Sequence, residues 1–235
     1  MGESLSDKSA LLIGAGGLGG PAALALAAAG LGRLTLVDED AVETSNLNRQ
    51  PLFGEADLGR RKAQAAASRI SWIHPGVKVD AVDARFGPDN AAALVQAADV
   101  VVDASDNFAT RFLANDSALA ARRPLVHGGV LRYSAQFLTV MPGKTGCLRC
   151  LFEAPPAEGT VPTCAQAGVL GALAGFAGAL MGAEALRLLA GERGAYAGRL
   201  VAFDGRSGRT RIVPVRVRAG CPVCSAVAGA TQERA

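Results

Sequence analysis

The chain has 235 residues, half of them hydrophobic, and a net charge of +3 at neutral pH. This length suits one well-packed core, so we predict a single domain over residues 1–235. The 24 basic residues are scattered and not clustered, so no nucleic-acid partner is expected. The N-terminal segment is polar and lacks the apolar core of a signal peptide, which favours a cytoplasmic protein.

Apolar runs alternate with helical stretches through the first half of the chain. We expect strands at 9–14, 33–38, 77–85, 99–104 and 124–130, and helices at 21–30, 59–73, 88–98 and 108–122. Such alternation is typical of a parallel sheet covered on both faces. A run at 135–141 and a hairpin at 200–217 add antiparallel strands. The predicted fold is therefore α/β: a Rossmann-like, mostly parallel sheet with helices on both faces, extended by antiparallel strands.

Two further segments need a structural interpretation. Residues 159–183 contain no charged side chain, which invites comparison with a membrane span. The stretch is interrupted by polar residues and glycines, so we favour a small-residue helix packed on the sheet or on a second subunit, and expect no membrane partner. Residues 226–235 are expected to form a flexible tail.

The segment "GAGGLG" follows the first expected strand and opens a helix. It fits the pattern G-x-G-x-x-G, and its glycines are Gly14, Gly16, Gly17 and Gly19. Such a turn lets backbone N–H groups approach a phosphate at a helix N-terminus. Asp38 ends the second expected strand, where a carboxylate accepts hydrogen bonds from ribose hydroxyls. The pattern predicts nucleotide binding; the alternative is a turn needed only for packing.

The next polar positions favour a triphosphate over a dinucleotide. Asn46 and Arg49 lie in "NLNRQ", and Lys62 begins the following helix. Guanidinium and ammonium groups grip phosphate oxygens, which a dehydrogenase does not need at this place. Asp106 follows the apolar strand "VVVD", where it could hold Mg²⁺ against the phosphates. Each residue alone could be a surface charge, and Asp103 or Asp106 could simply cap the next helix.

Four of the five cysteines form two C-x-x-C pairs, Cys147 with Cys150 and Cys221 with Cys224. Two such pairs in turn-like surroundings predict a closed, structural zinc knuckle. The alternative is two redox pairs, although neither pair lies in a thioredoxin-like context. Cys164 is left over, in a loop before a helix whose N-terminus would lower its pKa.

The ordered motifs "GAGGLGG", "LTLVDED…SNLNRQ", "GRRKA", "DASDN", "CLRC", "TCAQAGVLG" and "CPVC" resemble the ThiF/MoeB/HesA family, the bacterial relatives of ubiquitin-activating enzymes. The resemblance covers about residues 9 to 225. It implies an adenylyltransferase that uses ATP to activate the C-terminal glycine of a ubiquitin-like sulfur carrier ending in Gly-Gly, for thiamine or molybdopterin synthesis. It further implies a homodimer, with a sulfurtransferase or cysteine desulfurase as a further partner.

The resemblance also implies roles for individual residues. Asp38 would hold the ribose; Asn46, Arg49 and Lys62 would contact the phosphates; and Asp106 would bind Mg²⁺. The whole expected nucleotide set is Gly14, Gly16, Gly17, Gly19, Asp38, Asn46, Arg49, Lys62, Asp106 and Asn107, and the catalytic set is Arg49, Lys62, Asp106 and Cys164. Some family members use a cysteine at the position of Cys164 in sulfur transfer. No general base is required, since a glycine carboxylate is already ionised, and His127 is expected to be structural.

One departure from the family leaves alternatives open. Relatives carry an N-terminal arm with an arginine that reaches the partner subunit's site, and the segment before the first expected strand here contains no arginine. Arg60 or Arg61 could substitute. Otherwise the chain could be a nucleotide-binding scaffold with weak catalysis. A member that activates another carboxylate or a tRNA-borne group, and an NAD-dependent oxidoreductase, are the remaining alternatives.

Overall fold

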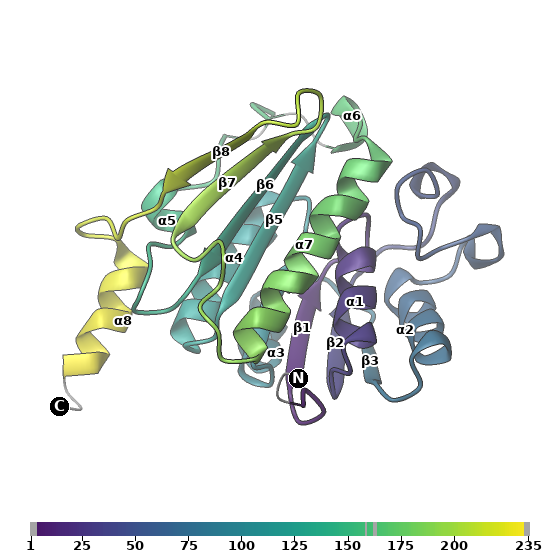
Figure 1. Ribbon diagram of the computed structural model, residues 1–235, viewed down its shortest axis with the longest axis horizontal. Helices are drawn as coiled ribbons and strands as arrows, with labels where there is room; N and C mark the ends of the chain where they lie inside the picture. The colour runs from purple at the N-terminus through teal and green to yellow at the C-terminus, as the bar shows by residue number, and fades with distance from the viewer. Residues whose placement is uncertain (1–3, 158, 162–163, 233–235) are drawn as a thin grey trace.

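The computed structural model describes the backbone of residues 4–157, 159–161 and 164–232 (Figure 1). Eight strands form a sheet in the order β3-β2-β1-β4-β5-β6-β7-β8. The first five are parallel: β1 (Ser9–Ile13), β2 (Arg33–Val37), β3 (Lys78–Val82), β4 (Val100–Asp103) and β5 (Leu125–Leu131). The antiparallel strands β6 (Ser134–Val140), β7 (Arg199–Asp204) and β8 (Thr210–Pro214) extend the sheet beyond β5. The predicted fold class is confirmed.

Helices cover both faces of the sheet (Figure 1). One face carries α1 (Gly19–Ala28), α2 (Lys62–Ile73) and α7 (Gly171–Leu189), and the other carries α3 (Pro88–Gln96) and α4 (Phe108–Ala120). Successive side chains of a strand alternate between faces, so Leu12 packs in the first core while Leu11 and Ile13 pack in the second. This two-sided burial explains the unbroken apolar strands of the parallel half.

The small-residue stretch forms α7, which packs against α1 within the same chain. A Cβ atom on Gly182 would lie 2.7 Å from the Cβ of Ala25, and one on Gly178 would overlap the carbonyl of Leu18. The glycines therefore let the two helix backbones approach closely. Over the described residues, α7 is the one helix long and apolar enough to span a membrane, and half of its most apolar window is buried inside the protein. The predicted packing on the chain's own fold is confirmed.

The C-terminal segment differs from the prediction of a tail. Helix α8 (Pro222–Gln232) continues through most of the segment expected to be flexible, and residues 233–235 lie outside the described part. Burial explains the helix: Cys221 and Cys224 are enclosed, and Val227 packs into the core beside α4. No local pattern predicts this helix, because the surface that anchors it belongs to distant residues.

The strand order places one end of the sheet for ligand binding. The chain runs outward from β1 to β2 and β3, then returns to build β4 and β5 on the other side of β1. The carboxyl ends of β1 and β4 are therefore neighbours from which the following segments diverge. Open α/β sheets bind ligands at such a switch point.

Candidate functional site

The glycine loop occupies the switch point, and its glycines have different reasons to be there. Gly14 has a φ of 90°, and a Cβ on Gly19 would overlap the Gly14 carbonyl. A Cβ on Gly17 would lie 3.0 Å from the Arg49 carbonyl. Gly16 has no such neighbour, since the nearest atom to its Cβ would be Nε2 of Gln50 at 3.5 Å. Three glycines thus satisfy packing, and Gly16 leaves room on the side open to a ligand.

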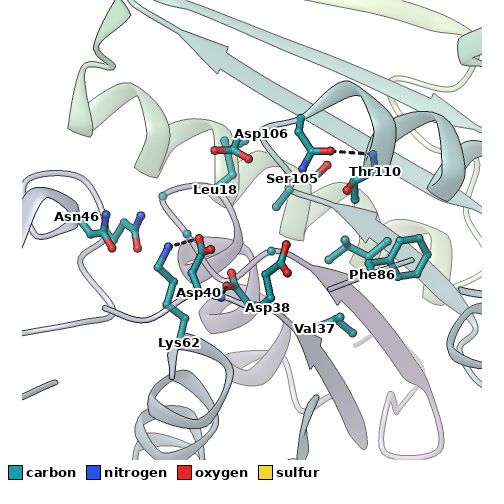
Figure 2. Close-up of a pocket in the computed structure, with 18 of the residues that line it drawn as sticks. Leu18, Val37, Asp38, Asp40, Asn46, Lys62, Phe86, Ser105, Asp106 and Thr110 are labelled. Carbon is teal, nitrogen blue, oxygen red and sulfur yellow. Dashed lines mark hydrogen bonds and ion pairs between the residues drawn. The ribbon is translucent and has the colours of Figure 1, made fainter. Parts of the chain in front are cut away.

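A cavity of about 240 Å³ lies beside this loop (Figure 2). It is bounded by the loops after β1, β2 and β4 and by the start of α2. Among the residues predicted from the sequence, those in its wall are Gly14, Gly16, Gly17, Asp38, Asn46, Arg49, Lys62, Asp106 and Asn107. Gly19 is set back from the wall, where it packs on Gly14. The fold therefore brings residues from five separate segments to one cavity.

Asp38 directly follows β2 and contacts the glycine loop. Its carboxylate accepts hydrogen bonds from the backbone N–H groups of Ala15 at 2.7 Å and Asp40 at 2.9 Å. Burial raises the pKa of Asp38, although these two hydrogen bonds and the charge of Lys62 act in the opposite direction. The acid is thereby held rigidly between the first and second strands, with its side chain directed at the cavity (Figure 2).

Lys62 is a buried cation in the cavity wall. It begins α2, its side chain is 7% exposed, and its ammonium contacts the Asp40 carboxylate at 2.8 Å. Asp40 is 63% exposed, so its negative charge is largely solvated. An anion entering the cavity would meet a lysine whose ammonium has one side-chain partner among the described residues, which leaves further N–H donors for the anion.

Asn46 and Arg49 belong to the segment after β2. The Asn46 side chain is buried in the cavity wall. Its oxygen accepts the backbone N–H of Glu43 at 3.1 Å, and its amide nitrogen donates to the Ser45 hydroxyl at 3.4 Å. Arg49 donates to the Ser45 carbonyl at 2.7 Å and to Asn48 at 3.1 Å. These bonds hold the guanidinium against the loop that contains the Asn46 side chain.

Asp106 and Asn107 connect β4 to α4. The Asn107 oxygen accepts the backbone N–H of Thr110 at 2.9 Å, so the residue that caps α4 is Asn107 and not Asp103 or Asp106. The Asp106 carboxylate makes no hydrogen bond or ion pair within the described part of the chain. It is exposed and points into the cavity (Figure 2). A carboxylate that lines the cavity in this way is suited to hold a divalent metal ion together with phosphate oxygens.

The two C-x-x-C pairs meet at the far side of the second core. Their four sulfur atoms lie within 4.8 Å of one another, with measured separations of 3.9, 3.9 and 3.5 Å. Four ligands at a Zn–S distance of about 2.3 Å around a tetrahedron would be about 3.8 Å apart. Burial raises the pKa values of Cys147 and Cys224, so four thiolates here need a cation to neutralise them. The residues fit a closed zinc site.

The sequence matches the model of the ThiF family over residues 2–223. The chain belongs to the ThiF family. Its sequence is 45% identical to the SAMP-activating enzyme E1 of Haloferax volcanii over 95% of this chain and 82% of that protein. It is 43% identical to the sulfur carrier protein adenylyltransferase of Thermus thermophilus, over 94% of this chain and 84% of that one.

Two other comparisons extend this picture. The adenylyltransferase and sulfurtransferase MOCS3 of Mus musculus is 43% identical over 94% of this chain, which spans 48% of that longer protein. The crystal structure of Escherichia coli MccB with ATP superposes with a TM-score of 0.83, covering 94% of this chain and 67% of MccB. At 22% identity, that likeness concerns the fold alone.

A buried polar network in this ThiF-family chain supports the loop after β4. The Asp103 carboxylate accepts from His127 Nδ1 at 2.7 Å and from the Ser105 hydroxyl at 2.5 Å. Burial would raise the pKa of Asp103, but its interactions with His127, Arg111 and Ser105 lower it below its ordinary value. His127 Nε2 is buried without a partner among the described residues. The histidine thus serves the structure, as expected, through one of its two nitrogens.

Several residues of the cavity wall were not found from the sequence. They are Arg111, which donates to the Ser105 carbonyl at 2.9 Å, and Gln50, Arg85, Phe86 and Ser105. Ser105 lies within the predicted "DASDN" segment and Arg111 follows it by about one helical turn, so their sequence positions offered a signal. Arg85 and Phe86 follow β3. They reach the site because β3 lies next to β2 in the sheet, so their position depends on the strand order.

Two further predictions concern Arg60 and Arg61 as substitutes for the arm arginine, and Cys164. Arg60 pairs with Asp57 at 2.7 Å and Arg61 with Asp83 at 2.6 Å, and neither lies in the described wall of the cavity. Their expected role as substitutes for an arm arginine therefore has no geometric support. Cys164 begins the short helix α6 (Cys164–Ala167), and its side chain lies outside the described residues.

Proposed function

We propose that this ThiF-family chain is an ATP-dependent adenylyltransferase that activates the C-terminal glycine of a ubiquitin-like sulfur carrier ending in Gly-Gly. The observation that carries the proposal is the cavity at the switch point, which Asp38, Arg49, Lys62 and Asp106 line together beside the glycine loop. The names of the relatives agree, since two of them are a SAMP-activating enzyme and a sulfur carrier protein adenylyltransferase.

The roles of the residues follow from their chemistry. Asp38 accepts hydrogen bonds from the ribose hydroxyls, and the backbone of the glycine loop with the N-terminus of α1 holds the phosphates. Arg49, Lys62 and the Asn46 amide bind the β- and γ-phosphate oxygens. Asp106 and Asn107 belong to the loop after β4, which forms another wall of the cavity. This assignment leaves the α-phosphate between the two walls, accessible to a carboxylate from solvent.

The reaction joins two anions. A carrier carboxylate oxygen attacks the α-phosphorus and forms an acyl–phosphate bond, while the bond from the α-phosphorus to the bridging oxygen of pyrophosphate breaks. Lys62 and Arg49 offset the repulsion and stabilise the negative charge on the departing pyrophosphate. No proton has to be removed, because the glycine carboxylate is ionised at neutral pH.

Two metal ions belong to the proposal. Asp106 would hold Mg²⁺, which would neutralise phosphate charge when bound. Cys147, Cys150, Cys221 and Cys224 would hold a structural Zn²⁺, with no position open for chemistry. The mostly apolar surroundings of the four thiols suit a site that serves folding.

The proposal also includes the pathway and the partners of the protein. The carrier feeds thiamine or molybdopterin synthesis, with sulfur supplied by a sulfurtransferase or a cysteine desulfurase. Cys164 is our candidate for a persulfide or thioester step, and the protein is proposed to act in the cytoplasm as a homodimer. One relative, MOCS3, combines an adenylyltransferase and a sulfurtransferase in its name, which agrees with the two steps being linked.

A second candidate function is a nucleotide-binding scaffold of the same fold that has little catalytic activity. It is favoured by the ion pairs of Arg60 and Arg61, which turn both arginines to partners outside the cavity. It predicts nucleotide affinity without bond formation. The same result would arise from a member specific for another carboxylate or a tRNA-borne group, so several acceptors must be tried.

Mass spectrometry of the carrier tests the proposal directly. The chain is incubated with MgATP, inorganic pyrophosphatase and a set of small proteins ending in Gly-Gly, and intact masses are recorded at short times. We expect one carrier to gain the mass of an adenylyl group, and a copy without its last glycine to gain nothing. Nucleotide binding with no adenylylated carrier in the set would support the scaffold.

A further inference from the structure

Helix α4 connects the cysteine cluster to the nucleotide cavity. Its N-terminal end follows Asp106 and is capped by Asn107, and its middle packs against α5 (Leu148–Leu151) and α8. Cys147 is the residue that caps α5, and Cys150 lies within it. Helix α4 therefore contacts both sites, although distant parts of the sequence form them. The nucleotide cavity lies at the N-terminal end of the helix, and the cysteine cluster lies beside its middle.

The first contact at the cysteine end is a two-point ion pair. Arg149 Nε lies 2.8 and 3.0 Å from the two Asp116 oxygens, and Nη2 lies 2.8 Å from the second of them. The guanidinium also stacks over the Phe112 ring at 5.0 Å. Bidentate and stacked geometry fixes orientation as well as distance. Arg149 sits between Cys147 and Cys150, so Asp116 fixes the turn that carries both sulfur atoms.

The second contact holds the backbone of that turn. Asn115 is fully buried, and its oxygen accepts the backbone N–H of Leu148 at 2.9 Å. Its amide nitrogen donates to Asp116 at 3.0 Å, so the two α4 residues support each other. Leu148 directly follows Cys147. Loss of the Asn115 side chain would leave a buried N–H group unpaired, which costs more than an exposed hydrogen bond.

The N-terminal end of α4 is attached to the loop that contains Asp106. Asn107 caps the helix, and Arg111 donates to the Ser105 carbonyl at 2.9 Å. Asp106 lies between these two attachment points. Arg111 and Asn115 are one helical turn apart, and Asn107 lies about 14 Å from Asp116 along the axis at 1.5 Å per residue. A short, regular helix thus joins the two sets of contacts.

We propose that Asn115, Asp116 and Arg149 are positioning residues: they lock the cysteine cluster with its metal to α4, and α4 in turn holds Asp106 where it meets the magnesium nucleotide. The proposal rests on the proposed function, because it assumes nucleotide binding beside Asp106. By linkage, any effect of zinc on nucleotide affinity must be matched by an equal effect of nucleotide on zinc affinity, and we expect a higher zinc affinity to appear as slower zinc release. The coupling is therefore measurable without a turnover assay.

The experiment follows zinc release from the full-length, zinc-loaded protein. A chromogenic chelator in excess reports the release rate with and without a non-hydrolysable ATP analogue and Mg²⁺. We expect the nucleotide to slow release by about fivefold or more in the wild type, the usual scale of coupling between sites. Asp116→Asn and Arg149→Gln should release zinc faster and lose the nucleotide effect, and Asp116→Glu should regain part of it.

Three controls separate this coupling from general effects. Asp80→Asn removes the acid of a partly exposed ion pair with Arg33, 3.5 Å apart on β2 and β3, and should behave as wild type. Lys62→Met should release zinc at the basal rate with or without nucleotide, which excludes chelation by the nucleotide itself. Nucleotide affinity by calorimetry and far-UV circular dichroism are measured for each variant. A variant that fails to fold is replaced by Arg149→Lys, which keeps the positive charge and loses the two-point geometry.

The outcomes are distinguishable. Wild-type protein that binds the nucleotide but releases zinc at an unchanged rate overturns the coupling and leaves the proposed function intact. Full nucleotide protection in Asp116→Asn and Arg149→Gln overturns the assignment of these residues. Failure of the wild type to bind nucleotide overturns the proposed function and the coupling with it.

Discussion

The Lys62 ammonium and the Asp40 carboxylate lie 2.8 Å apart, yet one is buried and the other is largely in solvent. A buried lysine next to a solvated acid holds a positive charge beside the cavity and keeps N–H donors available for a ligand. Lys62 is therefore suited to bind an anion, because its contact with the solvated Asp40 carboxylate can be broken at little cost in free energy.

Removal of the Lys62 charge should reduce activity far more than stability. Lys62→Met keeps the length of the side chain but loses the phosphate contact. We expect kcat/KM for adenylation to fall by about 100-fold, close to 3 kcal/mol of barrier. Steady-state kinetics with MgATP measure this, and thermal unfolding serves as the control. Unchanged kinetics in a folded variant would remove Lys62 from the phosphate site.

The glycine loop provides a matched pair of substitutions. A Cβ on Gly16 meets only Gln50 at 3.5 Å, so Gly16→Ala should fold normally and weaken ATP binding by about tenfold or more, because the methyl group occupies ligand space. A Cβ on Gly19 overlaps the Gly14 carbonyl, so Gly19→Ala should unfold at a clearly lower temperature. Calorimetric titration and thermal melts report both. Wild-type ATP affinity in Gly16→Ala would place the phosphates elsewhere.

Asp38 should give ATP binding a pH dependence of its own. Burial raises its pKa, so the carboxylate begins to take up a proton at a higher pH than an ordinary aspartate does. Protonation removes an acceptor for the ribose hydroxyls, and affinity should therefore fall as the pH drops through mildly acidic values. Asp38→Asn should bind more weakly at every pH and lose this component. Parallel pH profiles in the two proteins would contradict the ribose role.

The Asp103–His127 pair should be worth a measurable part of the stability. Asp103→Ala leaves His127 buried beside an empty site, and we expect the free energy of unfolding to fall by about 3 kcal/mol or more. The pKa of Asp103 is lowered, so its contribution is present above the unfolded value and is lost as the pH falls through the folded one. A double-mutant cycle with His127→Ala, by urea unfolding at pH 7, measures the coupling. Additive effects would mean that the two residues do not act together.

The local motifs were sufficient to predict much of the site. The glycine loop and Asp38 belong to the unit of β1, α1 and β2, and Lys62 begins the next α-helix along the chain. Because consecutive elements of an α/β sheet are neighbours in space, their meeting in one cavity followed from the sequence. The four cysteines were also predictable, because their spacing is restrictive even across 70 intervening residues.

Contacts between distant segments were not predictable in the same way. Asp103 and His127 meet because β4 and β5 are neighbours, and Asp116 meets Arg149 because α4 lies under the cysteine turn. Neither pair has a motif. Helix α8 is likewise anchored where Val227 packs in the core beside α4, which no local pattern in that segment shows.

The central claim is tested most directly by the rate of exchange of labelled pyrophosphate into ATP, with Mg²⁺, in the presence and absence of a carrier ending in Gly-Gly. We expect exchange that requires the carrier, is abolished by removal of its last glycine, and falls sharply in Asp106→Asn. Exchange that proceeds without any carrier, or no exchange with any carrier despite measurable ATP binding, would contradict it.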